Sequence, residues 1–256
     1  MAGHSKWANI KRQKARVDAK KGKTFTQLSR AIIVAARNGV ADPDGNFQLR
    51  TAIDKAKAAG IPNDNIERSL AKGAGTYQDD GAILEEIRYE GYGAGGVAIL
   101  VEALTDNRNR SAAYLREAFR KNGGNLGETG CVSWMFEQKG VVSLAAVDEE
   151  KLLEAIIEGG AENYEMYEDD EGAEVFTEVA NLENLNQTSQ AYNLPVTDLE
   201  LRWIPNNSIE VTDAEQARSL LKLIDALESL DDVQNVTANF EFSEELLLVI
   251  SHEKVP

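Results

Sequence analysis

The most informative stretch of the sequence is KGVVSLAAVDEEKLLEAIIEGGAENYEMYEDDEGAEVFTEVANLENLNQTSQAYNLPVTDLELRWIP, residues 139–205. Apolar residues alternate over parts of it and recur every three to four residues over others, which indicates strands and helices respectively. The predicted elements are strand 140–145, helix 148–158, strand 163–168, strand 173–179, helix 181–193 and strand 197–204. A β-α-β-β-α-β order is typical of the ferredoxin-like unit, so residues 139–205 are predicted to form one such domain, with an acidic composition.

The segments on either side of this unit contain too few strands to form separate sheets. The pattern before it predicts strands at 83–92 and 97–104, a helix beginning at Thr105-Asp106, and a strand at 132–136. The pattern after it predicts a strand at 207–211, a helix capped by Asp213, and a strand at 233–241. We therefore expect one discontinuous α+β domain, residues 77–138 plus 206–256, into which the first unit is inserted.

The N-terminal region is predicted to be helical. Apolar residues recur at helical spacing over 24–38, and Asn46 and Pro62 each begin a further helix. Residues 73–81 are rich in Gly and Asp and are typical of a linker. The expected fold class is α+β: a basic arm and a three-helix module in residues 1–76, followed by two ferredoxin-like domains, one inserted in the other.

Charges are divided unevenly along the chain. The formal net charge is −16, from 27 Lys and Arg against 43 Asp and Glu. Residues 1–76 hold 15 of the basic and 6 of the acidic residues, whereas residues 139–205 hold 3 and 16. A basic segment on an acidic body favours a protein that contacts nucleic acid on one side.

The basic residues near the N-terminus are the strongest candidates for a binding site. Lysines and arginines that neutralise phosphates release counterions, which gives salt-dependent affinity without reading the base sequence. Trp7 could stack on an exposed base, and Lys23, Arg30 and Arg37 recur every seven residues on one side of a helix. A solubilising tail is the alternative interpretation. The candidate nucleic-acid-binding residues are Lys6, Trp7, Lys11, Arg12, Lys14, Lys20, Lys21, Lys23, Arg30 and Arg37.

A second candidate contact lies in residues 105–110, Thr-Asp-Asn-Arg-Asn-Arg. Arg108 and Arg110 stand at the start of a predicted helix, where free N–H groups and the positive end of the helix dipole attract phosphate. The alternative is a helix capped by Asp106, with both arginines solvated.

Several classes of site are disfavoured. Cys131 is the single cysteine, and His4 and His252 lie at opposite ends of the chain, so we expect no disulfide, metal site or histidine-based catalytic site. Residues 91–96 match G-x-G-x-x-G but precede a strand, which predicts a hairpin and no cofactor. No apolar run is long enough to span a membrane and the start has no secretory signal, so a cytoplasmic location is expected.

Distinctive blocks of sequence are spread along the chain. They are residues 1–11 (MAGHSKWANIK), 18–23 (DAKKGK), 34–37 (VAAR), 89–93 (YEGYG), 104–110 (LTDNRNR), 123–127 (GGNLG) and 133–136 (SWMF). In these blocks the sequence resembles the YebC/PmpR family, which includes the mitochondrial translational activator of cytochrome c oxidase. The resemblance implies an N-terminal helical domain and two α+β domains that enclose a cleft, in a protein that is not an enzyme.

The resemblance also bears on function, because members of that family are described as DNA-binding transcriptional regulators. Some are described as translation factors that act at the ribosome when peptide-bond formation stalls. The first hypothesis is therefore a non-enzymatic regulator of gene expression whose basic module contacts the phosphates of DNA. A ribosome-associated translation factor that binds ribosomal RNA is one alternative. An adaptor whose acidic body meets ribosomal or transcription proteins is the other.

Overall fold

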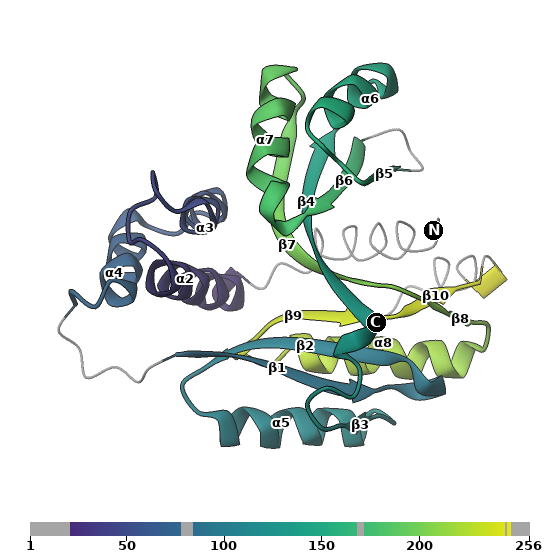
Figure 1. The fold of residues 1–256 in the computed structure, drawn as a ribbon. Coiled ribbons are helices and arrows are strands. Elements are labelled where there is room, and N and C mark those ends of the chain that lie inside the picture. Colours follow the sequence, from purple (N-terminus) through teal and green to yellow (C-terminus); the bar gives the residue numbers. More distant parts are fainter. Residues whose placement is uncertain (1–20, 78–83, 168–171, 244, 247–256) are drawn as a thin grey trace. The chain divides into compact units, whose positions relative to one another are not determined.

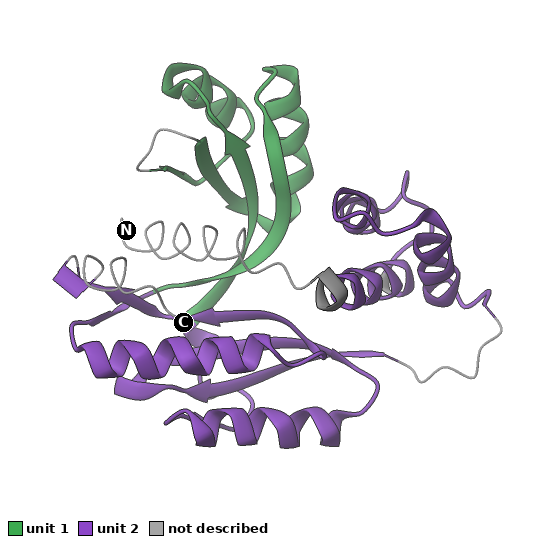
Figure 2. Ribbon diagram, turned by 180° about the vertical axis from the view of Figure 1, so that it is seen from behind, with its two compact units in different colours: residues 1–18, 136–206 green, residues 19–135, 207–256 purple. Residues whose placement is uncertain are grey.

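The structure is a computed structural model that describes residues 21–77, 84–167, 172–243 and 245–246 (Figure 1). The described residues divide into two compact units (Figure 2). Unit 1 comprises residues 136–206, and unit 2 comprises residues 21–135 together with 207–246. The chain passes from unit 2 into unit 1 and back again, so unit 1 is an insertion in unit 2.

Unit 2 begins with three helices, α2 (Lys21–Asn38), α3 (Phe47–Ala58) and α4 (Asn63–Gly73), which confirm the predicted helical module. Their apolar faces share a core that includes the fully buried Ile32 and Leu49. Asn46 caps α3 as predicted, since its side chain accepts a 3.1 Å hydrogen bond from the N–H of Leu49. At Gly73 a Cβ would lie 2.5 Å from the carbonyl oxygen of Ile33, so a glycine allows α4 to approach α2 closely.

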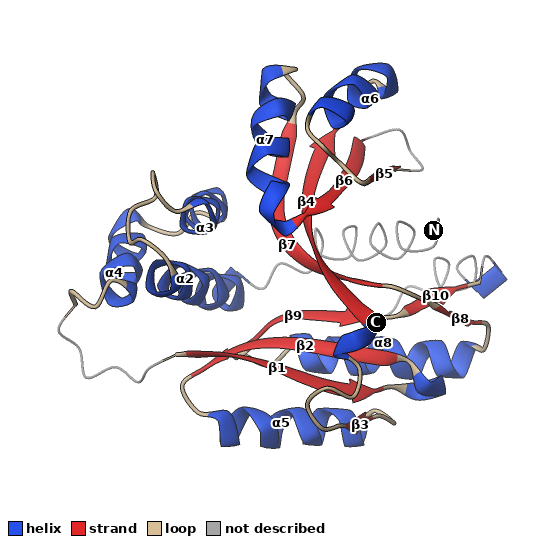
Figure 3. Ribbon diagram, in the orientation of Figure 1, coloured by secondary structure: helices blue, strands red, loops and turns tan. Residues whose placement is uncertain are grey.

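The rest of unit 2 is an α+β domain with a four-stranded antiparallel sheet of order β3-β1-β2-β9 (Figure 3). Its elements are β1 (Glu85–Tyr92), the 3-10 turn η1 (Ala94–Gly96), β2 (Ala98–Thr105), α5 (Arg108–Lys121), β3 (Asn125–Leu126), α8 (Ala214–Glu228) and β9 (Val233–Ala238). Both helices cover one face of the sheet, because a Cβ at Gly91 would meet Phe119 of α5 and a Cβ at Gly93 would meet Leu220 of α8. The glycine cluster forms a hairpin, as predicted.

The prediction of a strand at 132–136 is wrong, because Ser133–Met135 form the 3-10 turn η2. The cause is Glu90 of β1, whose buried carboxylate accepts hydrogen bonds from the backbone N–H groups of Gly130, Val132 and Ser133 at 2.8, 2.7 and 2.8 Å. Backbone groups that are bonded to this carboxylate are not available to a neighbouring strand. The edge of the sheet beside β1 is taken instead by the two-residue strand β3.

The strand predicted at 207–211 is present as β8 (Ile209–Val211), but it lies outside the four-stranded sheet. It pairs in parallel with β10 (Phe240–Phe242). At that end of the sheet β9, and not β8, pairs with β2. Asn239, between β9 and β10, accepts a 2.7 Å hydrogen bond from the N–H of Ala98 and fixes the point at which the chain leaves the sheet.

Unit 1 is the predicted ferredoxin-like domain. Its elements are β4 (Phe136–Ala145), α6 (Glu149–Glu158), β5 (Asn163–Met166), β6 (Gly172–Glu178), the 3-10 turn η3 (Val179–Asn181), α7 (Leu182–Ala191) and β7 (Val196–Pro205). The strands form an antiparallel sheet of order β5-β6-β4-β7. Leu152 of α6 and Leu185 of α7 are fully buried, which explains why the apolar pattern located both helices.

Candidate nucleic-acid interface

Half of the twelve predicted nucleic-acid-binding residues lie outside the described part of the chain. Lys6, Trp7, Lys11, Arg12, Lys14 and Lys20 precede residue 21. Lys21 and Lys23 belong to the first turn of α2, and their side chains are not described. The structure therefore places the side chains of four predicted residues: Arg30, Arg37, Arg108 and Arg110.

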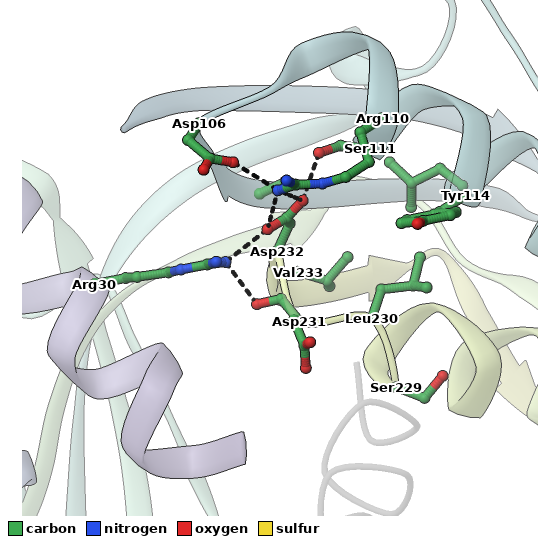
Figure 4. A pocket seen from close by; sticks show the side chains of 12 residues that line it. Arg30, Asp106, Arg110, Ser111, Tyr114, Ser229, Leu230, Asp231, Asp232 and Val233 are labelled. Atoms are coloured by element: carbon green, nitrogen blue, oxygen red, sulfur yellow. Dashed lines mark hydrogen bonds and ion pairs between the residues drawn. The ribbon is translucent and has the colours of Figure 1, made fainter. Parts of the chain in front are cut away.

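Two of these arginines, Arg30 and Arg110, meet at one carboxylate. Asp232, in the turn between α8 and β9, accepts a 2.7 Å hydrogen bond at Oδ1 from Nη1 of Arg30 and a 3.1 Å bond at Oδ2 from Nη2 of Arg110 (Figure 4). The hydroxyls of Ser111 and Thr105 donate to the same Oδ2 at 2.7 and 3.1 Å. The Asp232 side chain is only 9% exposed. Burial raises the pKa of this carboxyl, but the hydrogen bonds from Ser111, Arg110 and Arg30 outweigh it and hold the pKa below its ordinary value.

Arg30 packs α2 against the α+β domain. Besides Asp232, its Nη1 donates to the carbonyl oxygens of Asp231 at 2.8 Å and Leu104 at 3.1 Å. One turn earlier, Nε2 of Gln27 donates to the carbonyl of Val233 at 2.6 Å. The Arg30 side chain is 18% exposed. The expected contact of Arg30 with phosphate stays a prediction, and in this structure its partners are protein oxygens.

Arg37 lies on the same side of α2, as its seven-residue spacing from Arg30 predicts. Its side chain donates a 2.7 Å hydrogen bond to the carbonyl oxygen of Leu84, at the entrance to β1. The residue itself is exposed. The predicted common side of Arg30 and Arg37 therefore faces the start of the sheet domain.

The start of α5 differs from the prediction in its cap. Asn107, and not Asp106, is the N-cap: its side chain accepts a 3.0 Å hydrogen bond from the N–H of Arg110. Thr105 still belongs to β2, and its hydroxyl accepts a 2.9 Å bond from the N–H of Asn107. Asp106 pairs instead with the Arg110 guanidinium at 2.6 Å. The Arg108 side chain is 70% exposed, and its Nε lies 3.7 Å from Oε2 of Glu85.

A pocket of about 440 Å³ opens beside Asp232 (Figure 4). It is lined by Arg30, Ala103, Asp106, Arg110, Ser111, Tyr114, Leu115, Ser229, Leu230, Asp231, Asp232 and Val233. Both of its arginines are already bonded to carboxylates of the pocket. The pocket therefore offers an anion little uncompensated positive charge, and the ion pairs around Asp232 connect three segments of the chain.

The described residues give little support to catalysis. Burial, followed by the charge of Glu90, raises the pKa of the Cys131 thiol, which disfavours the reactive thiolate. Within the described ranges no three His, Cys, Asp or Glu side chains are grouped so as to hold a metal ion.

No helix in the described part of the chain has the length and apolar character needed to cross a membrane.

The basic character of α5 as a whole was not predicted from the sequence. Residues 77–256 contain twelve Lys and Arg, and five of them lie within this 14-residue helix. Arg116, Arg120 and Lys121 are exposed. The local concentration of positive charge is visible in the sequence, but the strongly negative net charge of residues 77–256 as a whole concealed it.

The fold and the charge distribution define a class of protein: a basic helical module followed by two α+β domains, one inserted in the other. Residues 5–76 match the family domain described as "TACO1/YebC protein N-terminal domain". Residues 84–240 match the description "TACO1/YebC second and third domain". The chain belongs to the TACO1/YebC family, which confirms the resemblance drawn from its sequence blocks.

Similar proteins cover nearly the whole chain. A "probable transcriptional regulatory protein" of Gloeothece citriformis is 78% identical over 250 residues, which are 96% of this chain and 98% of the relative. A protein of the same description from a Nostoc species is also 78% identical, over 97% of this chain and 99% of its own length. The crystal structure of a conserved hypothetical protein from Aquifex aeolicus is similar with a TM-score of 0.82 and 46% identity, and the match covers 91% of this chain and 95% of that one.

Proposed function

We propose that this protein is a regulator of gene expression that binds nucleic acid through its basic N-terminal residues, and that it acts in the cytoplasm without catalysis. The observation that carries the proposal is the charge distribution. Residues 1–76 contain 15 basic and 6 acidic residues within a chain of net charge −16. This basic region coincides with the matched N-terminal domain of the family. The regulatory role is supported by the names of the relatives from Gloeothece and Nostoc.

The proposed contact is made by charge and shape. The lysines and arginines of residues 6–23 neutralise phosphates, while the acidic body repels the same polyanion and limits the contact to one side. Arg30 contributes by fixing α2, the helix that continues from this segment, on the sheet domain of unit 2. Phosphate contacts of this kind position a protein on nucleic acid without specifying a sequence.

The test compares two variants with the same change in net charge. In one, Lys11, Arg12 and Lys14 are replaced by Gln; in the control, the exposed Lys151, Arg218 and Lys222 are replaced by Gln. Binding to a labelled DNA duplex and to a labelled ribosomal RNA fragment is measured between 50 and 200 mM salt. We expect the first variant to lower the slope of log affinity against log salt by about 2–3 on duplex DNA. Equal slopes for both variants and the unchanged protein would refute the proposal.

A second experiment identifies the nucleic acid. Crosslinking in growing cells, followed by sequencing of the attached nucleic acid, separates the three hypotheses for function. Recovery of promoter DNA supports a transcriptional regulator that binds DNA. Recovery of large-subunit ribosomal RNA supports the translation factor that relieves stalled peptide-bond formation. Recovery of neither favours an adaptor that meets transcription or ribosomal proteins through the acidic body.

A further inference from the structure

Helix α5 is an exception in an acidic body. It contains Arg108, Arg110, Arg116, Arg120 and Lys121 against one acidic residue, Glu117. The other helix on the same face of the sheet, α8, has two basic and three acidic residues. In unit 1, α6 has one basic and four acidic residues. The positive charge of α5 is therefore a local feature that the surrounding composition does not explain.

The stability of the helix explains only part of this charge. Cations favour the C-terminal turn of a helix and disfavour its N-terminal turn, so the helix dipole accounts only for Arg120 and Lys121. Arg116 and Arg120 are four residues apart on the same face, where like charges destabilise a helix.

The ion pairs of α5 leave these two arginines available. Lys121 binds Glu117 at 2.8 Å, and this contact is the main cause of the lowered pKa of Glu117. Arg120 lowers that pKa slightly through its charge, without a hydrogen bond. Among the described residues neither Arg116 nor Arg120 has an ion-pair partner, and both are exposed. The exposed surface of Arg116 and Arg120 is here named the α5 face.

The α5 face is also held to the helix that follows the basic N-terminal segment. Arg110 of α5 and Arg30 of α2 both bind Asp232, at 3.1 and 2.7 Å (Figure 4). Asp232 thus connects α5 with α2 inside unit 2.

We propose that the α5 face is a second binding surface for the phosphodiester backbone of nucleic acid. The ligand follows from charge complementarity: guanidinium groups pair with phosphate through two parallel hydrogen bonds, and the rest of the body repels a polyanion. The chemistry is shared by DNA and RNA, because both present the same backbone phosphates. This inference rests on the proposed function and adds a contact site to it.

The test uses the full chain with Arg116→Gln and Arg120→Gln together. The matched control is Arg218→Gln with Lys222→Gln, which removes the same charge from exposed positions of α8. The probes are labelled DNA and RNA oligonucleotides of equal length, single-stranded and duplex. We expect the α5 variant to lower the salt slope on duplex DNA by about 1–2 and to weaken binding several-fold, whereas the control changes the slope by less than half as much.

Two further outcomes separate this inference from the proposed function. If the triple Gln variant at Lys11, Arg12 and Lys14 weakens binding but the α5 variant equals its control, the second surface is refuted and the proposed function stands. If neither variant differs from its control, both proposals are refuted. A slope change on RNA alone or on DNA alone supports the surface and identifies its ligand.

Discussion

Arg30 and Asp232 are 202 residues apart in the sequence and form an ion pair of 2.7 Å in the structure. Asp232 also binds Arg110, at the start of α5. One carboxylate therefore fixes the helical module, the start of α5 and the entrance to β9 relative to one another within unit 2. Removing that carboxylate should affect all three segments together.

Asp232→Asn should destabilise unit 2. The amide retains the shape of the side chain but removes the charge that both arginines neutralise. It also directs an N–H group toward side chains that themselves donate hydrogen bonds. We expect the free energy of unfolding to fall by about 2–3 kcal/mol, less than for a fully buried pair because both arginines reach solvent. Urea unfolding followed by circular dichroism measures the change. Asp231→Asn, at the exposed neighbouring position, is the control and should change stability by less than about 0.5 kcal/mol.

Glu90→Gln should release the loop at 127–133 in a pH-dependent way. Burial raises the pKa of Glu90, but the N–H groups of Gly130, Val132 and Ser133 together lower it below its ordinary value. A carboxyl with a lowered folded pKa stabilises the fold above its unfolded pKa of about 4.3, and the contribution is lost as the pH falls through the folded pKa.

We therefore expect Glu90→Gln to cost about 1–3 kcal/mol at pH 7, and the cost to shrink as the pH falls below about 4. Urea unfolding at pH 7, 5, 4 and 3 measures both quantities. Glu86→Gln, at an exposed position of the same strand, is the control, and its difference in stability from wild type should not shrink in this way as the pH falls. A constant difference between wild type and Glu90→Gln across this range would contradict the assignment.

Gly91→Ala should displace the edge of the sheet in unit 2. A Cβ at this position would lie 2.6 Å from the carbonyl oxygen of Asn125 and 2.8 Å from the ring of Phe119, which is fully buried. Overpacking of this kind costs about 1–3 kcal/mol. Phe119→Leu makes room for the new methyl group. Thermal unfolding should therefore show that Phe119→Leu costs less stability in the Gly91→Ala protein than in the wild type. Additive losses would show that Phe119 is not the obstacle.

The sequence predicted the fold well where the pattern is local. Leu152 and Ile156 of α6 recur at helical spacing and are buried, so the helix could be located without knowledge of its partners. The two-residue strand β3 has no periodicity to detect. Residues 132–136 are mostly apolar, as in a short buried strand, but a distant carboxylate, Glu90, accepts hydrogen bonds from the backbone N–H groups of Val132 and Ser133. Contacts between distant residues decided both outcomes, and no local pattern encodes them.

The same limit applies to the candidate site. The seven-residue spacing of Arg30 and Arg37 correctly placed them on one side of α2, because helical geometry depends on spacing alone. It did not reveal that this side meets Asp232 and Leu84. Spacing identifies a face, whereas the partner of that face depends on the tertiary structure. The basic surface of α5 was missed for a different reason, since its charge was averaged with that of the acidic body.

Glu174 and Arg202 form a buried ion pair in unit 1. Glu174 of β6 is 3% exposed, and its two carboxylate oxygens accept hydrogen bonds from the Arg202 guanidinium of β7 at 3.0 and 3.1 Å. Arg202→Met leaves the buried carboxylate without this guanidinium, and we expect a loss of about 2–4 kcal/mol in urea unfolding. Adding Glu174→Leu removes the buried charge as well, so the double variant should recover most of that loss.

Lys139 of β4 supplies the control for the Arg202 variants. It lies opposite Arg202 in the sheet register and binds Glu137 and Glu162 at 2.9 and 2.8 Å. Those two carboxylates are 60% and 38% exposed at the side chain, so water replaces the lost ammonium group. Lys139→Met should therefore cost less than about 1 kcal/mol. If Lys139→Met and Arg202→Met cost the same, or if the double variant is no more stable than Arg202→Met alone, burial of the Glu174 charge is not what makes Arg202 necessary.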